Sequence, residues 1–256
     1  MALLKVLLLL LLGLGVSMNS HVSLNKRIIG GQNCDDKERL YHVRLEGDNG
    51  THASLCGGSL IHPRWILTAA HCWMSQPGWN TTATLRVHPR NATQEKQIIQ
   101  HNPVFYVDQW NERHDIMLLK LQRPVRNIRP VRLPRCNIRL RIGDTVQLAG
   151  DGPTTTNPNI LRSLNTTIPP HLQCVDMRVS GFAYSLINGY QFIAEAPYTE
   201  VYRGDSGGGV VFKKKIYGVM SARGINYAFR NPVFSLVVCD YMQWILKTTG
   251  LKTPKL

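Results

Sequence analysis

Short apolar or alternating segments recur along this chain, and Gly, Pro, Asn or Asp residues separate them. The clearest segments span residues 41–45, 65–68, 84–87, 116–121, 145–149, 210–212, 216–220 and 233–237. Segments this short, bounded by turn residues, are typical of β-strands. The pattern therefore predicts an all-β fold, either a sandwich or a pair of barrels. One helix is expected near the C-terminus, where Tyr241, Trp244 and Ile245 share a face before Gly250.

Composition excludes a disordered chain and indicates the charge of its partners. Hydrophobic residues make up 43% of the 256 residues and charged residues 18%, so enough apolar surface is available to offset the ordering entropy. Lys and Arg number 30 against 16 Asp and Glu, which gives a formal net charge of +14. Such a charge favours anionic partners, such as sulfated glycans, acidic membranes or nucleic acid.

The first 17 residues have the features of a secretory signal peptide. Lys5 precedes an apolar stretch over residues 6–14, and the small residues Gly15 and Ser17 follow. The stretch is too short and too early for a membrane span, although an uncleaved anchor is the alternative. No later segment reaches the roughly 18 uninterrupted apolar residues that a membrane span needs. We therefore expect a protein without a membrane span, secreted or stored in secretory granules. Four N-x-S/T sequons then predict glycosylated surface loops, at Asn49, Asn80, Asn91 and Asn165.

Two basic segments have alternative interpretations. In the first, an arginine occurs at every third position, with prolines between, at Arg123, Arg126, Arg129, Arg132 and Arg135. An extended polyproline-type conformation would align them in one stripe, either as an edge that binds heparin-like polyanions or as a linker with solvated arginines. The second segment, residues 213–215, is three lysines and favours a plain hairpin tip. Without interleaved aromatic residues, neither segment supports nucleic-acid recognition.

Three separate motifs contain the residue types needed for nucleophilic catalysis. They are Thr-Ala-Ala-His-Cys around His71, His-Asp-Ile-Met-Leu-Leu around Asp115, and Gly-Asp-Ser-Gly-Gly around Ser206. Ile-Ile-Gly-Gly at residues 28–31 precedes them. In this order the motifs resemble those of the trypsin/chymotrypsin-like serine endopeptidases, and the resemblance covers about residues 28–247.

The resemblance implies a role for each member of this set. A serine hydroxyl is a weak nucleophile, so Ser206 needs a base to take its proton during attack on a peptide carbonyl. His71 would be that base and would then protonate the leaving amine, while Asp115 would orient His71 and stabilise its imidazolium form. The backbone N–H groups of Gly204 and Ser206 would form the oxyanion hole.

The resemblance also implies a zymogen and a two-barrel fold. Cleavage after Arg27 would free the α-ammonium of Ile28 to pair with Asp205. Residues 18–27 would then be an activation propeptide, after the signal peptide of residues 1–17. Residues 28–256 would form the protease domain, as two packed six-stranded antiparallel β-barrels of roughly residues 28–135 and 136–256 with a C-terminal helix.

Six cysteines fit this family only in part. The resemblance implies a Cys56–Cys72 disulfide beside His71 and a Cys136–Cys239 disulfide. For Cys34 and Cys174 the even number of cysteines favours a bond. Their spacing relative to family positions slightly favours two unpaired thiols or an unusual bridge, so the pairing stays open.

The expected specificity pocket departs from the family pattern. Ser221, Ala222 and Arg223 stand where active relatives carry Ser-Trp-Gly, and Val233 occupies a position that is usually glycine. We expect a narrowed pocket. Glu200 could attract a basic substrate side chain, pair with Arg223 and plug the pocket, or be a solvated carboxylate.

The sequence therefore predicts a secreted serine endopeptidase that acts on proteins or peptides as a monomer. The alternative is an inactive protease homologue that acts as a basic glycan-binding or antimicrobial protein, because fold alone does not fix function. No HExxH, CxxC or acidic Ca²⁺ loop occurs, so no metal or other cofactor is expected.

Overall fold

The computed structural model describes residues 31–89, 91–151, 171–185, 188–197, 201, 204–223 and 232–254. The signal peptide and propeptide predicted for residues 1–27 lie outside this part of the chain, as do Ile28, Asn165 and Glu200.

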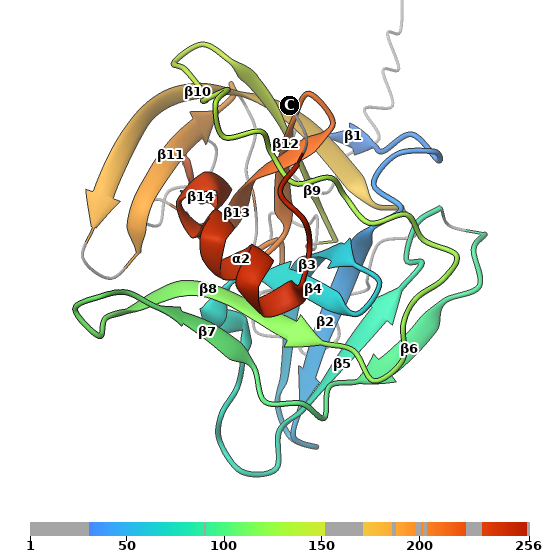
Figure 1. Cartoon of the computed structure of the whole chain (residues 1–256). Helices are drawn as coiled ribbons and strands as arrows, with labels where there is room; N and C mark the ends of the chain where they lie inside the picture. The colour runs from blue at the N-terminus through green and yellow to red at the C-terminus, as the bar shows by residue number, and fades with distance from the viewer. Residues whose placement is uncertain are drawn as a thin grey trace, which may run out of the picture.

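The N-terminal half forms one antiparallel sheet of seven strands (Figure 1). Its order is β6-β5-β2-β3-β4-β8-β7. The strands are β2 (His42–Asp48), β3 (Ala53–His62), β4 (Trp65–Thr68), β5 (Asn80–Leu85), β6 (Glu95–Ile98), β7 (Val104–Val107) and β8 (Arg113–Lys120). Most of β2 and the second half of β3 are buried in consecutive residues, so apolar side chains such as Leu45 and Leu60 are removed from water and stabilise the sheet.

The C-terminal half forms the closed barrel (Figure 1). Its strands are β1 (Gln32–Asn33), β9 (Thr145–Gly150), β10 (Gln173–Ser185), β11 (Gly189–Glu195), β12 (Gly209–Phe212), β13 (Lys215–Arg223) and β14 (Val233–Val237). Strand β9 pairs with both β10 and β12, so six strands close on themselves and β1 adds to β10. Closure leaves these six strands without a free edge.

The all-β fold class with one C-terminal helix is confirmed, with one difference of detail. The C-terminal half has the predicted barrel of six strands, whereas the sheet of the N-terminal half has seven strands. The additional strand is β7, which forms a hairpin with β8. The Asp108 carboxylate holds this turn, because it accepts hydrogen bonds from the backbone N–H groups of Trp110 and Glu112 at 2.9 Å each.

The C-terminal helix joins the two halves. Helix α2 (Met242–Thr249) follows a 3₁₀ turn, η3 (Val238–Tyr241), and lies over β8 in Figure 1. Tyr241 and Ile245 are buried in the core cluster of the N-terminal sheet, as their shared face predicted. Gly250 ends the helix at φ +74°, a left-handed conformation that glycine adopts without steric cost.

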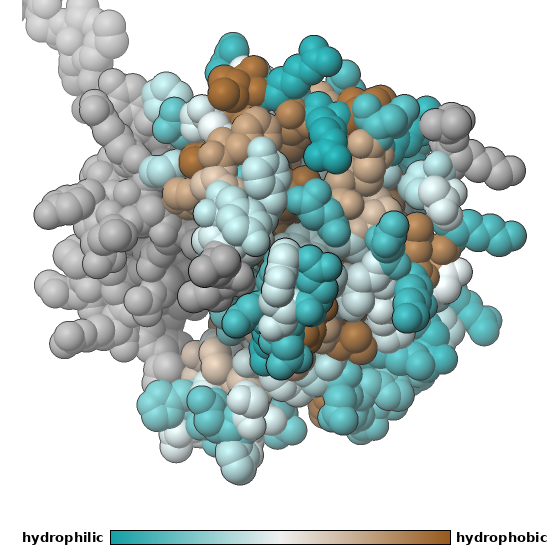
Figure 2. Space-filling view, turned by 60° about the vertical axis from the view of Figure 1, so that its left-hand side comes forward, coloured by the Kyte–Doolittle hydropathy of each residue, from teal (hydrophilic) through white to brown (hydrophobic). Residues whose placement is uncertain are grey.

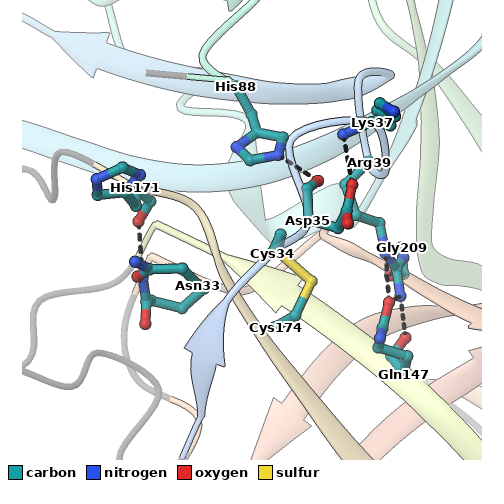
Figure 3. Close-up of a disulfide and its surroundings, with 11 residues drawn as sticks. Asn33, Cys34, Asp35, Lys37, Arg39, His88, Gln147, His171, Cys174 and Gly209 are labelled. Carbon is teal, nitrogen blue, oxygen red and sulfur yellow. Dashed lines mark hydrogen bonds between the residues drawn. A yellow bond between two sulfur atoms is a disulfide. The ribbon is translucent and has the colours of Figure 1, made fainter. Parts of the chain in front are cut away.

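Three disulfides form, and one of them corrects the sequence analysis. Cys56–Cys72 and Cys136–Cys239 are confirmed. Cys34 and Cys174 are also bonded, so the slight preference for unpaired thiols was wrong (Figure 3). The reason is tertiary: β1 pairs with the start of β10, and this brings the two Cα atoms to 4.9 Å across 140 residues of sequence. The spacing of cysteines along the chain does not indicate that β1 pairs with β10, so it could not predict this bond.

The linker between the halves keeps the predicted period of three. Val125, Ile128 and Val131 are buried, whereas all five arginines of the stripe are exposed. The linker is therefore packed on one side and cationic on the other. On the face shown in Figure 2, hydrophilic side chains dominate the lower half and smaller hydrophobic groups gather above them. Within the described residues, no helix is long and apolar enough to cross a membrane.

Candidate active site

His71 and Asp115 form a close, doubly bonded pair. The backbone N–H of His71 donates to Oδ1 of Asp115 at 2.8 Å, and Nδ1 of His71 lies 2.8 Å from Oδ2. The Ser221 hydroxyl also donates to Oδ2 of Asp115. The imidazole is 44% exposed and the carboxylate 14%, so the imidazole is partly open to solvent while Asp115 is mostly covered. This arrangement fixes the orientation of the imidazole.

Local strand pairing brings this pair together. Thr68, the last residue of β4, pairs with Met117 of β8, so the chain just after β4 lies beside Asp115. A 3₁₀ turn, η1 (Ala70–Cys72), then presents His71, and the Cys56–Cys72 disulfide ties the turn to β3. The ligand atoms of His71 and these two cysteines lie within 4.8 Å of one another, but the disulfide removes both thiolates as metal ligands.

The loop that carries Ser206 packs against the strands that lead to His71. The carbonyl of Ser206 accepts a hydrogen bond from the N–H of Gly57 at 2.7 Å, and it lies 3.7 Å from Sγ of Cys72. Gly207 has φ +80°, and a Cβ there would lie 2.1 Å from Oγ1 of Thr68. Only glycine fits this contact, so the loop sits beside the residues that precede His71.

The backbone around Ser206 also offers donors for an oxyanion. Gly204 is buried with φ +108°, a conformation that favours glycine. The N–H groups of Gly204 and Ser206 donate no hydrogen bond to another residue of the described chain. Asp205 between them is fully buried, and its carboxylate points at Gly150, where a Cβ would lie 1.9 Å from Oδ1.

Comparison with known proteins agrees with this geometry. The family model described as Trypsin matches residues 28–245. The chain belongs to the trypsin family. Its relatives include mouse Granzyme F, 33% identical over 88% of this chain and 92% of the relative. Human Granzyme M is 32% identical over 94% and 96%, and human Cathepsin G is 31% identical over 86% and 87%. Membership of the trypsin family supports serine endopeptidase as the general class of this protein.

Two of the four predicted pocket residues of this trypsin-family chain, Ser221 and Val233, have described side chains. Ser221 is buried, and its hydroxyl bonds to Asp115, a contact that the sequence analysis missed when it placed Ser221 only on the substrate strand. Val233 is buried in the core cluster of the C-terminal barrel and pairs with Arg223, the last residue of β13. Glu200 and the side chain of Arg223 lie outside the described structure, so their pairing stays a prediction.

A second polar cluster, which the sequence analysis did not predict, lies buried between the two halves. Nε of Arg44 donates to Oδ2 of Asp151 at 3.0 Å, and Nε2 of His42 lies 3.5 Å from the same oxygen. Burial by itself raises the pKa of Asp151, but His42 and Arg44 outweigh burial and lower this pKa to about 2. No pattern along the chain predicted this cluster, because His42 and Arg44 lie in β2 whereas Asp151 follows β9.

Proposed function

We propose that this chain is a secreted serine endopeptidase that hydrolyses peptide bonds through an acyl-enzyme on Ser206. The observation that carries the proposal is the hydrogen-bonded His71–Asp115 pair, with the Ser206 loop packed against Gly57 of β3 and Thr68 of β4. Membership of the trypsin family supports the same reaction.

The proposed mechanism uses the chain's own groups. Nε2 of His71 removes the proton from Oγ of Ser206 as that oxygen bonds to the substrate carbonyl carbon. The carbonyl oxygen becomes an oxyanion, which the N–H groups of Gly204 and Ser206 stabilise. The C–N bond then breaks, and His71 gives its proton to the leaving amine. Water, deprotonated by His71, attacks the acyl-enzyme and releases the acid product.

Activation by cleavage after Arg27 belongs to the proposal. The new ammonium group of Ile28 would pair with Asp205, whose complete burial makes an ionic partner favourable. We also propose glycosylation at Asn80 and Asn91, which are exposed, and at Asn49, which is partly exposed. The predicted signal peptide supports secretion or storage in granules, and we propose that the protein is a monomer.

Covalent labelling tests the catalytic proposal directly. A small fluorophosphonate probe needs an activated serine and little pocket space. After cleavage at Arg27 in vitro, we expect labelling of the wild type and none of the Ser206→Ala variant. A correctly cleaved wild-type protein that does not label would contradict the proposal, because the proposed nucleophile would then be inactive.

The exposed arginine stripe favours a second candidate function. We propose that the protein also binds heparin-like polyanions, either beside proteolysis or, if Ser206 does not label, as a glycan-binding protease homologue. All five arginines are exposed while Val125, Ile128 and Val131 are buried, so the linker presents its cations to solvent.

A further inference from the structure

A cavity of about 600 Å³ lies beside the linker, and its lining holds more cations than carboxylates. We call it the basic cavity. Six of its 16 lining residues are Lys or Arg, and two are carboxylates, Glu38 and Asp176. Its cations come from three separate segments of the chain, as Lys37, Arg39, Arg129, Arg132, Lys213 and Lys214. The excess of positive charge in a concave site favours an anionic ligand.

The two basic segments that the sequence showed separately meet at this cavity. The backbone N–H of Ile216 donates to the carbonyl of Arg132 at 3.0 Å, and Arg132 forms a parallel bridge with Lys215. This contact places the arginine stripe against the lysine turn. Burial and the nearby charges of Arg135 and Arg132 lower the pKa of Lys215, because neighbouring cations disfavour its charged form. An anion placed among them would relieve that repulsion.

Arg39 forms part of the cavity wall, and its side-chain hydrogen bonds go to neutral acceptors. Its side chain is buried, and its guanidinium donates to the side chain and carbonyl of Gln147 at 2.7–3.0 Å and to the carbonyl of Gly209 at 3.3 Å (Figure 3). Among the described residues, no carboxylate pairs with this guanidinium at salt-bridge distance. This buried cation adds to the positive potential of the cavity, and the nearby carboxylates of Glu38 and Asp176 offset part of it.

The lysine turn has a sequence that the backbone does not favour. Lys213 and Lys214 connect β12 to β13 with φ +48° and +61°. Two-residue hairpin turns with both residues at positive φ usually contain Asn-Gly or Gly-Gly. Backbone conformation does not explain the lysines at positions 213 and 214, because positive φ is unfavourable for lysine. Their positive charge is the property that a ligand would recognise.

The basic cavity is separate from the catalytic residues. Strand β12 begins just after the Ser206 loop and ends next to Lys213, a strand length of roughly 13 Å. Strand β9 likewise runs from Thr145 at the cavity to Gly150 beside Asp205. A ligand in the cavity therefore leaves the Ser206 loop open to substrate.

We propose that the basic cavity binds the sulfate groups of a linear sulfated glycan whose chain continues along the arginine stripe. Exposed arginines at every third residue of the linker suit a polymer with regularly repeated anionic groups. A nucleic acid fits less well, because Tyr41 is the only aromatic residue in the described lining and bases need stacking surfaces. The proposal rests on the second candidate function and specifies its site.

Calorimetric titration with a heparin hexasaccharide at roughly physiological ionic strength tests the site. The test variant is Lys213→Asn/Lys214→Gly, which removes two charges and supplies residues that the turn prefers. The matched control is Lys96→Gln/Lys247→Gln, which removes two exposed charges outside the cavity. We expect the test variant to bind at least about tenfold more weakly than wild type, and the control to change less than about threefold.

The possible results distinguish a wrong binding site from a protein that does not bind polyanions at all. Equal weakening in both variants, or unchanged affinity in the test variant, would overturn the cavity as the site while leaving polyanion binding intact. Wild-type protein that does not bind the hexasaccharide would overturn both. A single-stranded oligonucleotide of the same charge should bind about tenfold more weakly than the hexasaccharide, and equal binding would refute the choice of a glycan. Labelling of Ser206 in the test variant should equal that of wild type.

Discussion

Replacing Asp151 by asparagine should destabilise the fold by an amount that the structure predicts. The Asp151 carboxylate is 3% exposed and lies 3.0 Å from Nε of Arg44. Its pKa falls from 3.8 to about 2, and each unit corresponds to about 1.4 kcal/mol, so the charged form gains about 2–3 kcal/mol on folding. The asparagine side chain would resemble the neutral acid, and we expect the free energy of unfolding at pH 7 to fall by about 2–3 kcal/mol.

The sign of the pH dependence follows from the lowered pKa. A carboxyl group whose pKa is lower in the folded state stabilises the fold above its unfolded pKa, and that stabilisation is lost as the pH falls through the folded value. The difference between wild type and Asp151→Asn should therefore be complete above about pH 5 and should shrink between about pH 4 and 2. Urea unfolding followed by tryptophan fluorescence at several pH values measures it.

A double variant serves as the control for packing. Arg44→Met/Asp151→Leu removes both partners of the buried pair, and such apolar replacements are often neutral or stabilising. We expect this variant to recover most of the stability lost in Asp151→Asn. A single variant as stable as wild type at pH 7, or a difference that persists unchanged at pH 2, would refute the assigned ion pair.

Three further predictions concern other parts of the molecule. Cys34→Ala/Cys174→Ala should lower the unfolding free energy by about 2–5 kcal/mol, because the bond closes a loop of 140 residues, and denaturant unfolding would show no such loss if the bond is absent. Tyr241→Phe removes the hydrogen bond to Nδ1 of His114 at 2.9 Å and should lower the melting temperature through a loss of about 1 kcal/mol, whereas an unchanged temperature would argue against that bond. Arg223→Gly should increase hydrolysis of peptide substrates if this side chain plugs the pocket, and unchanged kcat/KM would reject the plug.

The features of this protein that depend on local residue patterns could be predicted from the sequence. The strands and the C-terminal helix could be predicted because the spacing of apolar residues indicates which side of an element is buried. The period of three in the linker was readable for the same reason, since buried Val125, Ile128 and Val131 alternate with exposed arginines. The motifs around His71 and Asp115 predicted a pair that the structure indeed brings together.

Contacts between distant strands were missed or left open. The bond between Cys34 and Cys174 depends on β1 pairing with β10, and no local pattern specifies that pairing. The hydroxyl of Ser221 reaches Asp115 across 106 residues, although the sequence analysis connected Ser221 only with the substrate. Both contacts are set by register between strands, which is decided by the packing of whole sheets.

By itself, the sequence determined the all-β class, the C-terminal helix, the trypsin-family motifs and the basic character of the chain. Only the tertiary structure decided which charges face one another. It buried Asp151 between His42 and Arg44, and it placed the linker arginines against the lysine turn to form one cavity. The physical reason is that electrostatic energy depends on distance and burial in three dimensions, and neither quantity is encoded in the spacing of residues along a chain.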